Sequence, residues 1–264
     1  MLKKFINKLL GKKENSKVID HEMDLINADI PLAEKVDQML IGFYGEEGLK
    51  KMKKFELKLD SKRYKYKNLS FDTFNWTKQK ESLEENFIMW ACNEYPIGMS
   101  LNFFNLEPDL PKQFDINVIR DMYWEGGAAI LKCDFAEIQG IPCVESLFKA
   151  VHEDRVVQYI TNLIIPFEDR SFVLKVFSED FGDTGLRDST IFPLVSERDF
   201  FDKTDMTIYP YDENREGRMT IAEKEEYDYL LPFHHLTILR KVIPEFLKTI
   251  SLEDELKDLK PFYK

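Results

Sequence analysis

The middle of the chain contains four consecutive runs rich in apolar residues: "AAILKCDFAEI" (128–138), "IPCVESLFKAV" (141–151), "VVQYITNLIIPF" (156–167) and "SFVLKVFSED" (171–180). This pattern predicts four β-strands. Only "QG", "HEDR" and "EDR" separate them. Connections this short cannot cross over a sheet, so neighbouring strands are predicted to be antiparallel. Apolar residues occur at both alternating positions of the second run, which predicts that both faces of the sheet are at least partly covered.

The segments before this meander predict a mixture of helix and strand. Residues 20–56 are predicted to be mostly helical, because apolar residues recur there at helical spacing. A further helix is expected over 78–93. Asp115 is a suitable N-cap for a helix that ends at Gly126-Gly127. Strands are expected where apolar and charged or polar residues alternate, over 54–60, 63–71 and 97–106.

After the meander we expect an irregular polar connection of some forty residues, followed by a helix that Thr237 caps and that reaches Ile250. The predicted fold class is therefore α+β, with a central antiparallel meander sheet and flanking helices. The predicted organisation is a basic amphipathic leader (1–17), an N-terminal α/β portion packed on or preceding the core (18–110), and an α+β core domain with C-terminal helices (111–264).

Charge is unevenly distributed along the chain, whose net charge is −11. Residues 1–17 carry six lysines against one glutamate, so the remainder carries −16. An acidic body repels phosphate backbones, which argues against nucleic-acid binding. The leader has apolar residues at helical spacing, so weak peripheral contact with an anionic membrane is one interpretation and a helix docked on its own domain is the other. No apolar run approaches the length of a membrane span.

The three cysteines, Cys92, Cys133 and Cys143, form no CxxC pair. Their odd number and their spacing argue against a disulfide framework and against a zinc site, and they favour a reducing cytoplasm. The chain contains neither a GxSxG elbow nor an HExxH motif. We therefore expect no cofactor and no metal, and we consider a non-enzymatic protein more consistent with the sequence than an enzyme.

A series of motifs resembles an uncharacterised family of bacterial proteins. It runs from "GGAAILKCDFAEIQGIPCVESLFKAV" through "PFEDRSFVLK", "TGLRD" and "YD" to "DYLLPFHHLTILR", over roughly residues 115–250. The motif elements fall at Gly126, Gly127, Gly140, Pro142, Pro166, Phe167, Ser171, Val173, Lys175, Thr184, Gly185, Arg187, Asp188, Tyr211, Asp212, Asp228, Pro232, His234, Leu236, Thr237 and Arg240. This resemblance implies no particular activity.

The meander with flanking helices is also similar to the Mog1/PsbP-type sandwich, a likeness at the level of fold alone. Proteins of that shape mainly bind other proteins, so the resemblance implies a binding role. The first 110 residues lie outside both resemblances.

The densest group of polar residues lies between the meander and the last helices, and its candidate site residues are Arg187, Asp212, Asp228, His234 and Arg240. Arg187 offers a planar five-donor fork, and its expected partner in an acidic chain is an internal carboxylate such as Asp212 or Asp228. His234 is expected to form a hydrogen bond with Asp228 or with a backbone carbonyl. We interpret these residues as ties that hold the connection against the sheet, with ligand binding as the alternative.

Two functions from different classes follow from these observations. The first is a non-catalytic, cytoplasmic adaptor or chaperone-like protein that receives a protein partner on one face of the sheet or between the sheet and the C-terminal segment. The second is a hydrolase or transferase of unfamiliar type, in which His234, Arg187, Asp212 and Asp228 line one polar pocket. The identity of the partner and the oligomeric state do not follow from the sequence.

Overall fold

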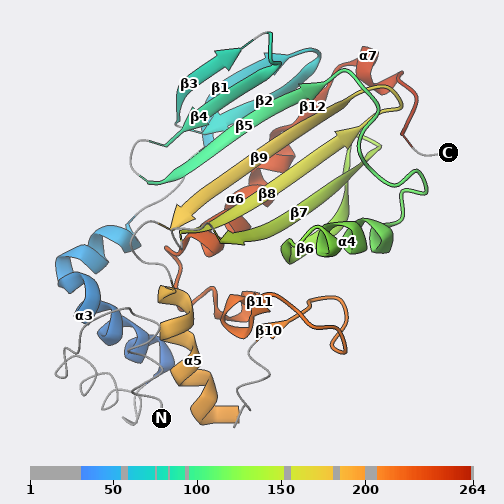
Figure 1. Cartoon of the computed structure of the whole chain (residues 1–264). Helices are drawn as coiled ribbons and strands as arrows, with labels where there is room; N and C mark the ends of the chain where they lie inside the picture. Colours follow the sequence, from blue (N-terminus) through green and yellow to red (C-terminus); the bar gives the residue numbers. More distant parts are fainter. Residues whose placement is uncertain are drawn as a thin grey trace.

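The computed structural model describes residues 31–54, 59–74, 76–82, 84–92, 95–151, 156–180, 185–199 and 207–262. The described strands form a seven-stranded sheet in the order β3-β4-β5-β9-β8-β7-β6 and a three-stranded sheet in the order β1-β2-β12 (Figure 1). The strands of the large sheet are β3 (Thr77–Ser82), β4 (Phe87–Ala91), β5 (Ile97–Phe104), β6 (Ala129–Ile138), β7 (Ile141–Val151), β8 (Val157–Pro166) and β9 (Ser171–Asp180). Those of the small sheet are β1 (Leu59–Tyr66), β2 (Leu69–Phe74) and β12 (Ser251–Leu252).

The predicted meander is confirmed, because β6, β7, β8 and β9 pair in sequence order and every pair is antiparallel. The predicted α+β class is confirmed with it. The sheet continues beyond β9 into β5, β4 and β3, which all precede residue 110. The expected division of the chain at residue 110 stays a prediction. The leader (1–17) lies outside the described residues, so its membrane contact stays a prediction too.

The helix expected over 78–93 is wrong, because these residues belong to the hairpin of β3 and β4. The lysines, glutamine and glutamate of β3 are good helix formers, but they form an exposed edge strand. In β4, Ile88 and Trp90 are buried while their neighbours are only half-buried. This period of two is typical of a strand. The strand expected over 63–71 is divided by a turn at Lys67-Asn68, between β1 and β2.

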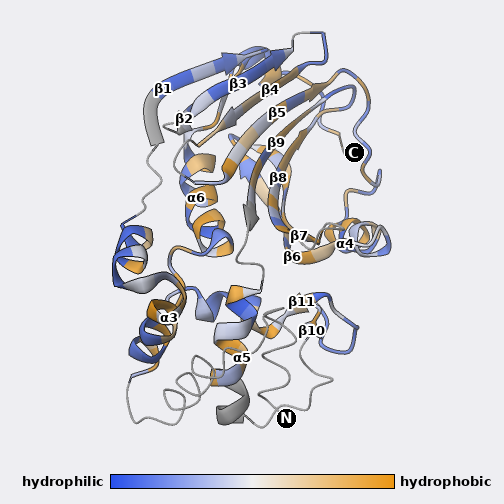
Figure 2. Ribbon diagram, turned by 60° about the vertical axis from the view of Figure 1, so that its left-hand side comes forward, coloured by the Kyte–Doolittle hydropathy of each residue, from blue (hydrophilic) through white to orange (hydrophobic). Residues whose placement is uncertain are grey.

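Helices cover the large sheet unequally on its two faces. Helix α6 (His235–Thr249) packs on one face, where Leu239, Val242 and Phe246 join the side chains of β5, β8 and β9 in the largest hydrophobic cluster. The small sheet contributes to the same cluster. Helix α4 (Ile116–Glu125), capped by Asp115 as predicted, packs on the opposite face against β6. Figure 2 shows α6 and α4 on opposite sides of the strands.

The connection between β9 and α6 is more ordered than predicted. It contains the fourteen-residue helix α5 (Leu186–Asp199), the short antiparallel pair β10 (Thr207–Ile208) and β11 (Met219–Thr220), and two 3-10 turns, η2 (Ile221–Glu223) and η3 (Glu225–Tyr227). Helix α5 packs with the turns and with α3 (Leu32–Lys53), the helix predicted within 20–56. Among its described side chains, the buried apolar Leu186, Ile191 and Leu194 are interspersed with the buried polar Arg187, Ser189 and Thr190.

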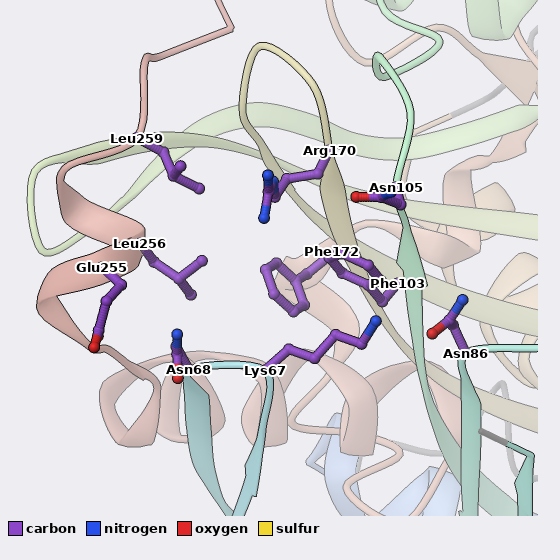
Figure 3. Close-up of a pocket in the computed structure, with 10 residues that line it drawn as sticks. All are labelled: Lys67, Asn68, Asn86, Phe103, Asn105, Arg170, Phe172, Glu255, Leu256 and Leu259. Carbon is purple, nitrogen blue, oxygen red and sulfur yellow. The ribbon is translucent and has the colours of Figure 1, made fainter. Parts of the chain in front are cut away.

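At one end of the two sheets, the strand turns leave a hollow of about 560 Å³ (Figure 3). The turn between β1 and β2, the turn between β3 and β4, the end of β5 and the hairpin between β8 and β9 contribute to its wall. The C-terminal helix α7 (Asp254–Lys257) closes the remaining side. We name this space the end hollow.

Candidate functional site

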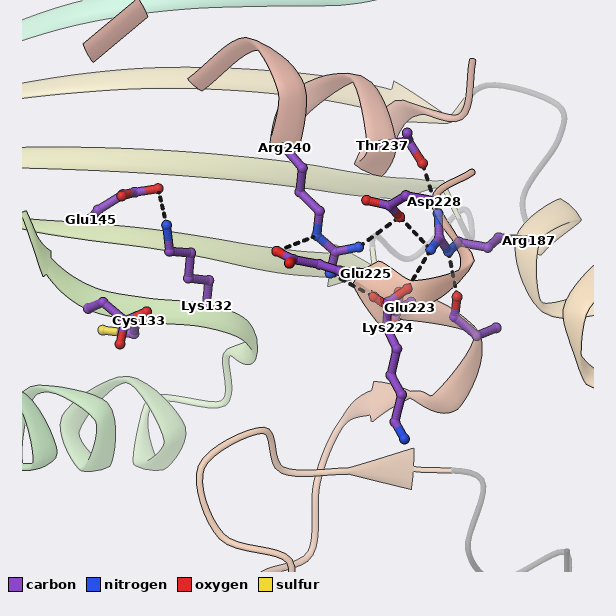
Figure 4. A network of polar contacts seen from close by, with 12 residues as sticks. Lys132, Cys133, Glu145, Arg187, Glu223, Lys224, Glu225, Asp228, Thr237 and Arg240 are labelled. Carbon is purple, nitrogen blue, oxygen red and sulfur yellow. Dashed lines mark hydrogen bonds and ion pairs between the residues drawn. The ribbon is translucent and has the colours of Figure 1, made fainter. Parts of the chain in front are cut away.

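The polar connection forms a buried cluster around Asp228, shown in Figure 4. The Oδ1 atom of Asp228 accepts hydrogen bonds from Arg187 Nη2 at 2.6 Å and from Arg240 Nη1 at 3.0 Å. Arg187 also donates to the Thr237 hydroxyl at 3.0 Å and to the Lys224 carbonyl at 2.9 Å. Its side chain is only 2% exposed. The cluster therefore joins α5, η3 and the first turn of α6, and Asp228 is the internal partner expected for Arg187.

Glu223 is a second centre of this network, and the sequence analysis did not identify it. Its carboxylate accepts hydrogen bonds from Lys149 Nζ at 2.8 Å, from the Tyr159 hydroxyl at 3.1 Å and from the Thr220 backbone N at 2.7 Å. Thr220 and Glu223 form a capping box at η2. The spacing Thr-x-x-Glu was the signal in the sequence that pointed to it. Glu223 ties the connection to β7 and β8.

The two adjacent histidines are buried at the start of α6. His234 is the N-cap of the helix, in place of the predicted Thr237, and its Nδ1 accepts from the Leu236 backbone N at 3.2 Å. Burial, with the charges of Arg187, His235 and Arg240, holds the pKa of His234 well below its usual range. Burial also lowers the pKa of His235 to about 4. Both rings are therefore neutral near pH 7.

Asp212 does not join this cluster. It lies in the loop between β10 and β11, where its Oδ1 accepts from the Asn214 backbone N at 2.9 Å. Of the two carboxylates named as alternative partners of Arg187, Asp228 is therefore the one that pairs with it. The neighbouring Tyr211 packs on α4 instead, with its ring centroid 3.5 Å from the Arg120 guanidinium carbon. The structure thus brings together Arg187, Asp228, Arg240 and His234 of the five candidate residues.

This arrangement favours a structural role for the cluster. A general base needs access to the proton that it removes, and a ligand-binding arginine needs free donors facing solvent. His234 is 3% exposed, and Arg187 is directed to protein acceptors on every side. These observations count against the enzymatic hypothesis, which stays a prediction. Among the residues that the structure describes, no group of three or more His, Cys, Asp or Glu side chains could hold a metal ion.

A second candidate is the part of the large sheet that faces away from α6. We call it the open face: the side chains on that side of β4, β5, β8 and β9. Of the described elements, α4 and the loop before it cover mainly the neighbouring strands β6 and β7, and they reach β8 at Ile164. In Figure 1 this face is turned toward the viewer, with α6 behind β8 and β9. Its members include Phe87, Met89, Ala91, Gly98, Ser100, Asn102, Phe104, Ile160, Asn162, Ile164, Val173, Lys175 and Phe177.

The strand register arranges these side chains in rows across the open face. A polar row joins Asn162, Lys175 and Ser100, which are direct cross-strand neighbours. On one side of it lies a row that contains Ile160, Phe177 and Gly98, and on the other a row that contains Val173, Asn102 and Phe87. The apolar side chains in these rows are half-buried by one another. The open face is therefore a mainly apolar surface with one central band of polar groups.

The described helices include none that is both long and apolar enough to cross a membrane. No protein-family model matches the sequence, and no curated protein matches it either. Solved structures with a similar arrangement include yeast (Saccharomyces cerevisiae) Ran-binding protein Mog1p, at 8% identity and a TM-score of 0.44, over 75% of this chain and 98% of that one. CyanoP, the PsbP protein of Synechocystis, matches at 11% identity and a TM-score of 0.35, over 51% of this chain and 89% of that one.

A third similar structure comes from Bacteroides thetaiotaomicron, at 11% identity and a TM-score of 0.29. That match covers 48% of this chain and 43% of the other, so it spans less than half of either protein. The comparison therefore includes both kinds of protein, Mog1 and PsbP, that the meander with flanking helices resembles. At these identities the likeness concerns the arrangement of helices and strands alone.

Proposed function

We propose that this chain is a non-catalytic binding protein that receives a protein partner on the open face. The observation that supports this most is the contrast in cover. On one side the strands are sealed by α6 and the small sheet; on the other, the described cluster around α4 reaches β8 at Ile164 and includes no residue of β4, β5 or β9. Contiguous apolar surface of this kind is typical of protein–protein contact. Phe104 at one end of this face is 43% exposed.

The charge on the open face restricts the chemistry of the partner. Lys175 is exposed at its centre and has no carboxylate partner among the described residues. Lys80, at the β3 rim, pairs with Glu85. The described side chains of the open face include no carboxylate, although the chain as a whole is acidic. We therefore assign the face to a partner that presents apolar side chains around a carboxylate, which would pair with Lys175.

A second copy of this chain is a poorer occupant. A two-fold interface places the same patch on both subunits, so one centred on this face would bring two Lys175 ammonium groups together. Like charges facing each other across an interface oppose association. The proposed partner is therefore a different protein.

The edges of the large sheet are less suited to binding than its face. On the edge strand β3, Lys78 and Lys80 project into solvent, which discourages the addition of another strand. On the other edge strand, β6, the outward N–H of Cys133 donates to the Tyr211 hydroxyl and its carbonyl accepts from Arg120 Nε at 2.9 Å. At Cys133, the backbone groups that a new strand would pair with are therefore already occupied. The open face is therefore a more suitable surface for a protein partner than either edge.

The proposal is tested by site-specific photo-crosslinking in the cells from which the sequence comes. A photoreactive phenylalanine analogue replaces Val173 on the open face or, as a control, Tyr229, which is 63% exposed on the connection before α6. We expect a discrete crosslinked band from position 173 and none of that size from position 229. The band should weaken strongly when Lys175→Glu is added, because the introduced glutamate would repel the partner's carboxylate.

Two outcomes contradict this function. Equal crosslinking from both positions would indicate nonspecific proximity, and no band from position 173 would indicate an unoccupied face. Circular dichroism of the Lys175→Glu variant should match that of the unchanged chain, because Lys175 is exposed.

We also propose that the protein works in the reducing cytoplasm. The buried thiols of Cys133 and Cys143 are both free, as is usual for cysteines in that compartment.

A further inference from the structure

The end hollow has the size and composition of a small-ligand site. Its volume, about 560 Å³, is in the range of pockets that hold small molecules. Phe103, Phe172 and Leu256 form its apolar floor, and the close-up shows the two rings between the Lys67-Asn68 turn and the hairpin that carries Arg170 (Figure 3). The two phenylalanine rings pack together with centroids 5.0 Å apart. An apolar floor with a polar rim is the usual composition of such a site.

Lys67 places a positive charge directly on this floor. Its Nζ lies 3.9 Å from the centroid of the Phe103 ring and 5.6 Å from that of Tyr66. No carboxylate pairs with it among the residues that the structure describes. The second cation of the rim, Arg170, is held by Asp169 through two hydrogen bonds of 2.8 and 2.9 Å. Lys67 is thus the cation that remains available to an anionic ligand.

The backbone fixes Lys67 in this position at some cost. Lys67 and Asn68 form the turn between β1 and β2 with φ values of 46° and 67°. Asparagine tolerates this left-handed conformation, whereas for lysine it is less favourable by about 1 kcal/mol. The Asn68 carbonyl accepts from the Glu253 backbone N at 2.9 Å, which ties the turn to the chain before α7. A two-residue hairpin turn with positive φ at both central residues is a common connection between antiparallel strands, so the turn itself sets the position of Lys67.

The other polar groups of the rim also favour an acceptor ligand. Asn86 accepts from the Tyr66 hydroxyl through Oδ1 at 3.1 Å, so its amide N–H groups remain as donors. Asn105 adds a further amide. Among the described residues that line the end hollow, Glu255 is the one carboxylate. The rim therefore provides two cations and several amide donors against one acid.

We propose that the end hollow binds a carboxylate that is attached to a small apolar or aromatic group. The carboxylate would pair with the Lys67 ammonium and accept from the Asn86 amide, while the apolar group would lie on Phe103, Phe172 and Leu256. Such a group can be the C-terminal residue of a polypeptide or a free carboxylic acid. This site lies at the end of the sheets and is independent of the open face, so it goes beyond the proposed function.

The probes are N-acetyl-phenylalanine, its amide, and an N-acetylated pentapeptide that ends in phenylalanine, each titrated into the full chain by isothermal calorimetry. We expect binding of the carboxylates and at least a roughly tenfold loss for the amide, because the amide cannot form the ion pair. Lys67→Met keeps the aliphatic stem but removes the charge, and should weaken binding about tenfold. Lys67→Arg should retain binding, and Lys62→Met, at an exposed lysine of β1, should leave it unchanged.

These titrations distinguish the two sources of the carboxylate, and some of their outcomes overturn the proposal. A pentapeptide that binds at least about tenfold tighter than N-acetyl-phenylalanine identifies a chain terminus as the ligand, whereas equal affinities identify a small carboxylic acid. No binding of any carboxylate probe at about millimolar concentration overturns the proposal, since that corresponds to about −4 kcal/mol or weaker. Equal binding of acid and amide, or an unchanged affinity in Lys67→Met, overturns it as well. The crosslinking from position 173 is unaffected by any of these results.

Discussion

The two faces of the large sheet are built from the same strands but differ in how deeply their side chains are buried. On the side toward α6, Met99, Leu101, Leu174 and Val176 are at most 2% exposed. On the other side, Val173 and Phe177 alternate with those residues along β9 and remain only half-buried. Because alternate residues of a strand point to opposite faces, each strand contributes to both surfaces at once.

Apolar character along a strand therefore does not by itself indicate burial within one chain. The open face carries aromatic and β-branched residues that would suit a core. On the α6 side, such residues stabilise the fold; on the open face, they are available to a partner. The two faces should therefore respond differently to substitution.

The largest contrast is expected between two phenylalanines. Phe246 of α6 is 2% exposed and packs edge-on against Phe71, with ring centroids 5.6 Å apart. Phe246→Ala should lower the free energy of unfolding by about 3–5 kcal/mol, because it leaves a cavity in the core. Phe177→Ala on the open face should lower it by about 1 kcal/mol or less. Urea unfolding followed by circular dichroism measures both values.

If Phe177→Ala destabilised the protein as much as Phe246→Ala does, the face would be covered in solution and the comparison would be wrong. Phe246→Leu serves as a matched control, since it keeps most of the buried volume and should cost well under half of the alanine variant.

A similar contrast is expected for charged residues. Arg187→Met removes the donor side of a buried ion pair and leaves the Ala222 and Lys224 carbonyls without their partner. The free energy of unfolding should fall by about 3–5 kcal/mol, as it does when buried pairs are broken. Lys175→Met on the open face should change it by no more than about 0.5 kcal/mol. The reverse order would show that Lys175, and not the Asp228 cluster, supports the fold.

The behaviour in mild acid depends on the histidines on the covered side. Their pKa values are lowered in the folded chain, so below about pH 6.5 the unfolded chain binds protons that the folded chain does not. Stability is therefore lost as the pH falls from 6.5 toward about 4, the folded pKa of His235. At pH 5 the loss from His235 should be about 2 kcal/mol relative to pH 7. His235→Gln should show a shallower pH dependence; an unchanged one would contradict this assignment.

The meander was predictable because its information is local. Runs of ten residues separated by two to four polar ones leave few alternatives to antiparallel pairing, and the observed register follows them closely. The β3–β4 hairpin was mispredicted because the composition of β3, "TKQKES", favours helix, and only its pairing with β4 makes it a strand. Local propensity was overridden there by a tertiary contact.

The polar cluster was half predictable for a related reason. The pairing of Arg187 with Asp228 follows from the chemistry of a buried guanidinium in an acidic chain, but the choice between Asp212 and Asp228 depends on how the loop between β10 and β11 folds. The end hollow could not be predicted at all. It depends on three turns and α7 meeting in space, and the sequence places Lys67 and Leu256 almost two hundred residues apart.

The smallest expected effect concerns Gly98, where β5 lies beneath the ring of Phe177. A Cβ atom at this position would lie 2.5 Å from the Phe177 ring, so the ring must move in Gly98→Ala. Since the outer side of the ring faces no described element, it can swing outward, and the cost should be only about 1 kcal/mol. Gly42→Ala in α3, where nothing lies within 4 Å, should be neutral or slightly stabilising. A cost of about 3 kcal/mol or more at Gly98 would mean that Phe177 is confined as in a core, whereas a small cost with weaker crosslinking from position 173 would show that the ring's placement serves the partner.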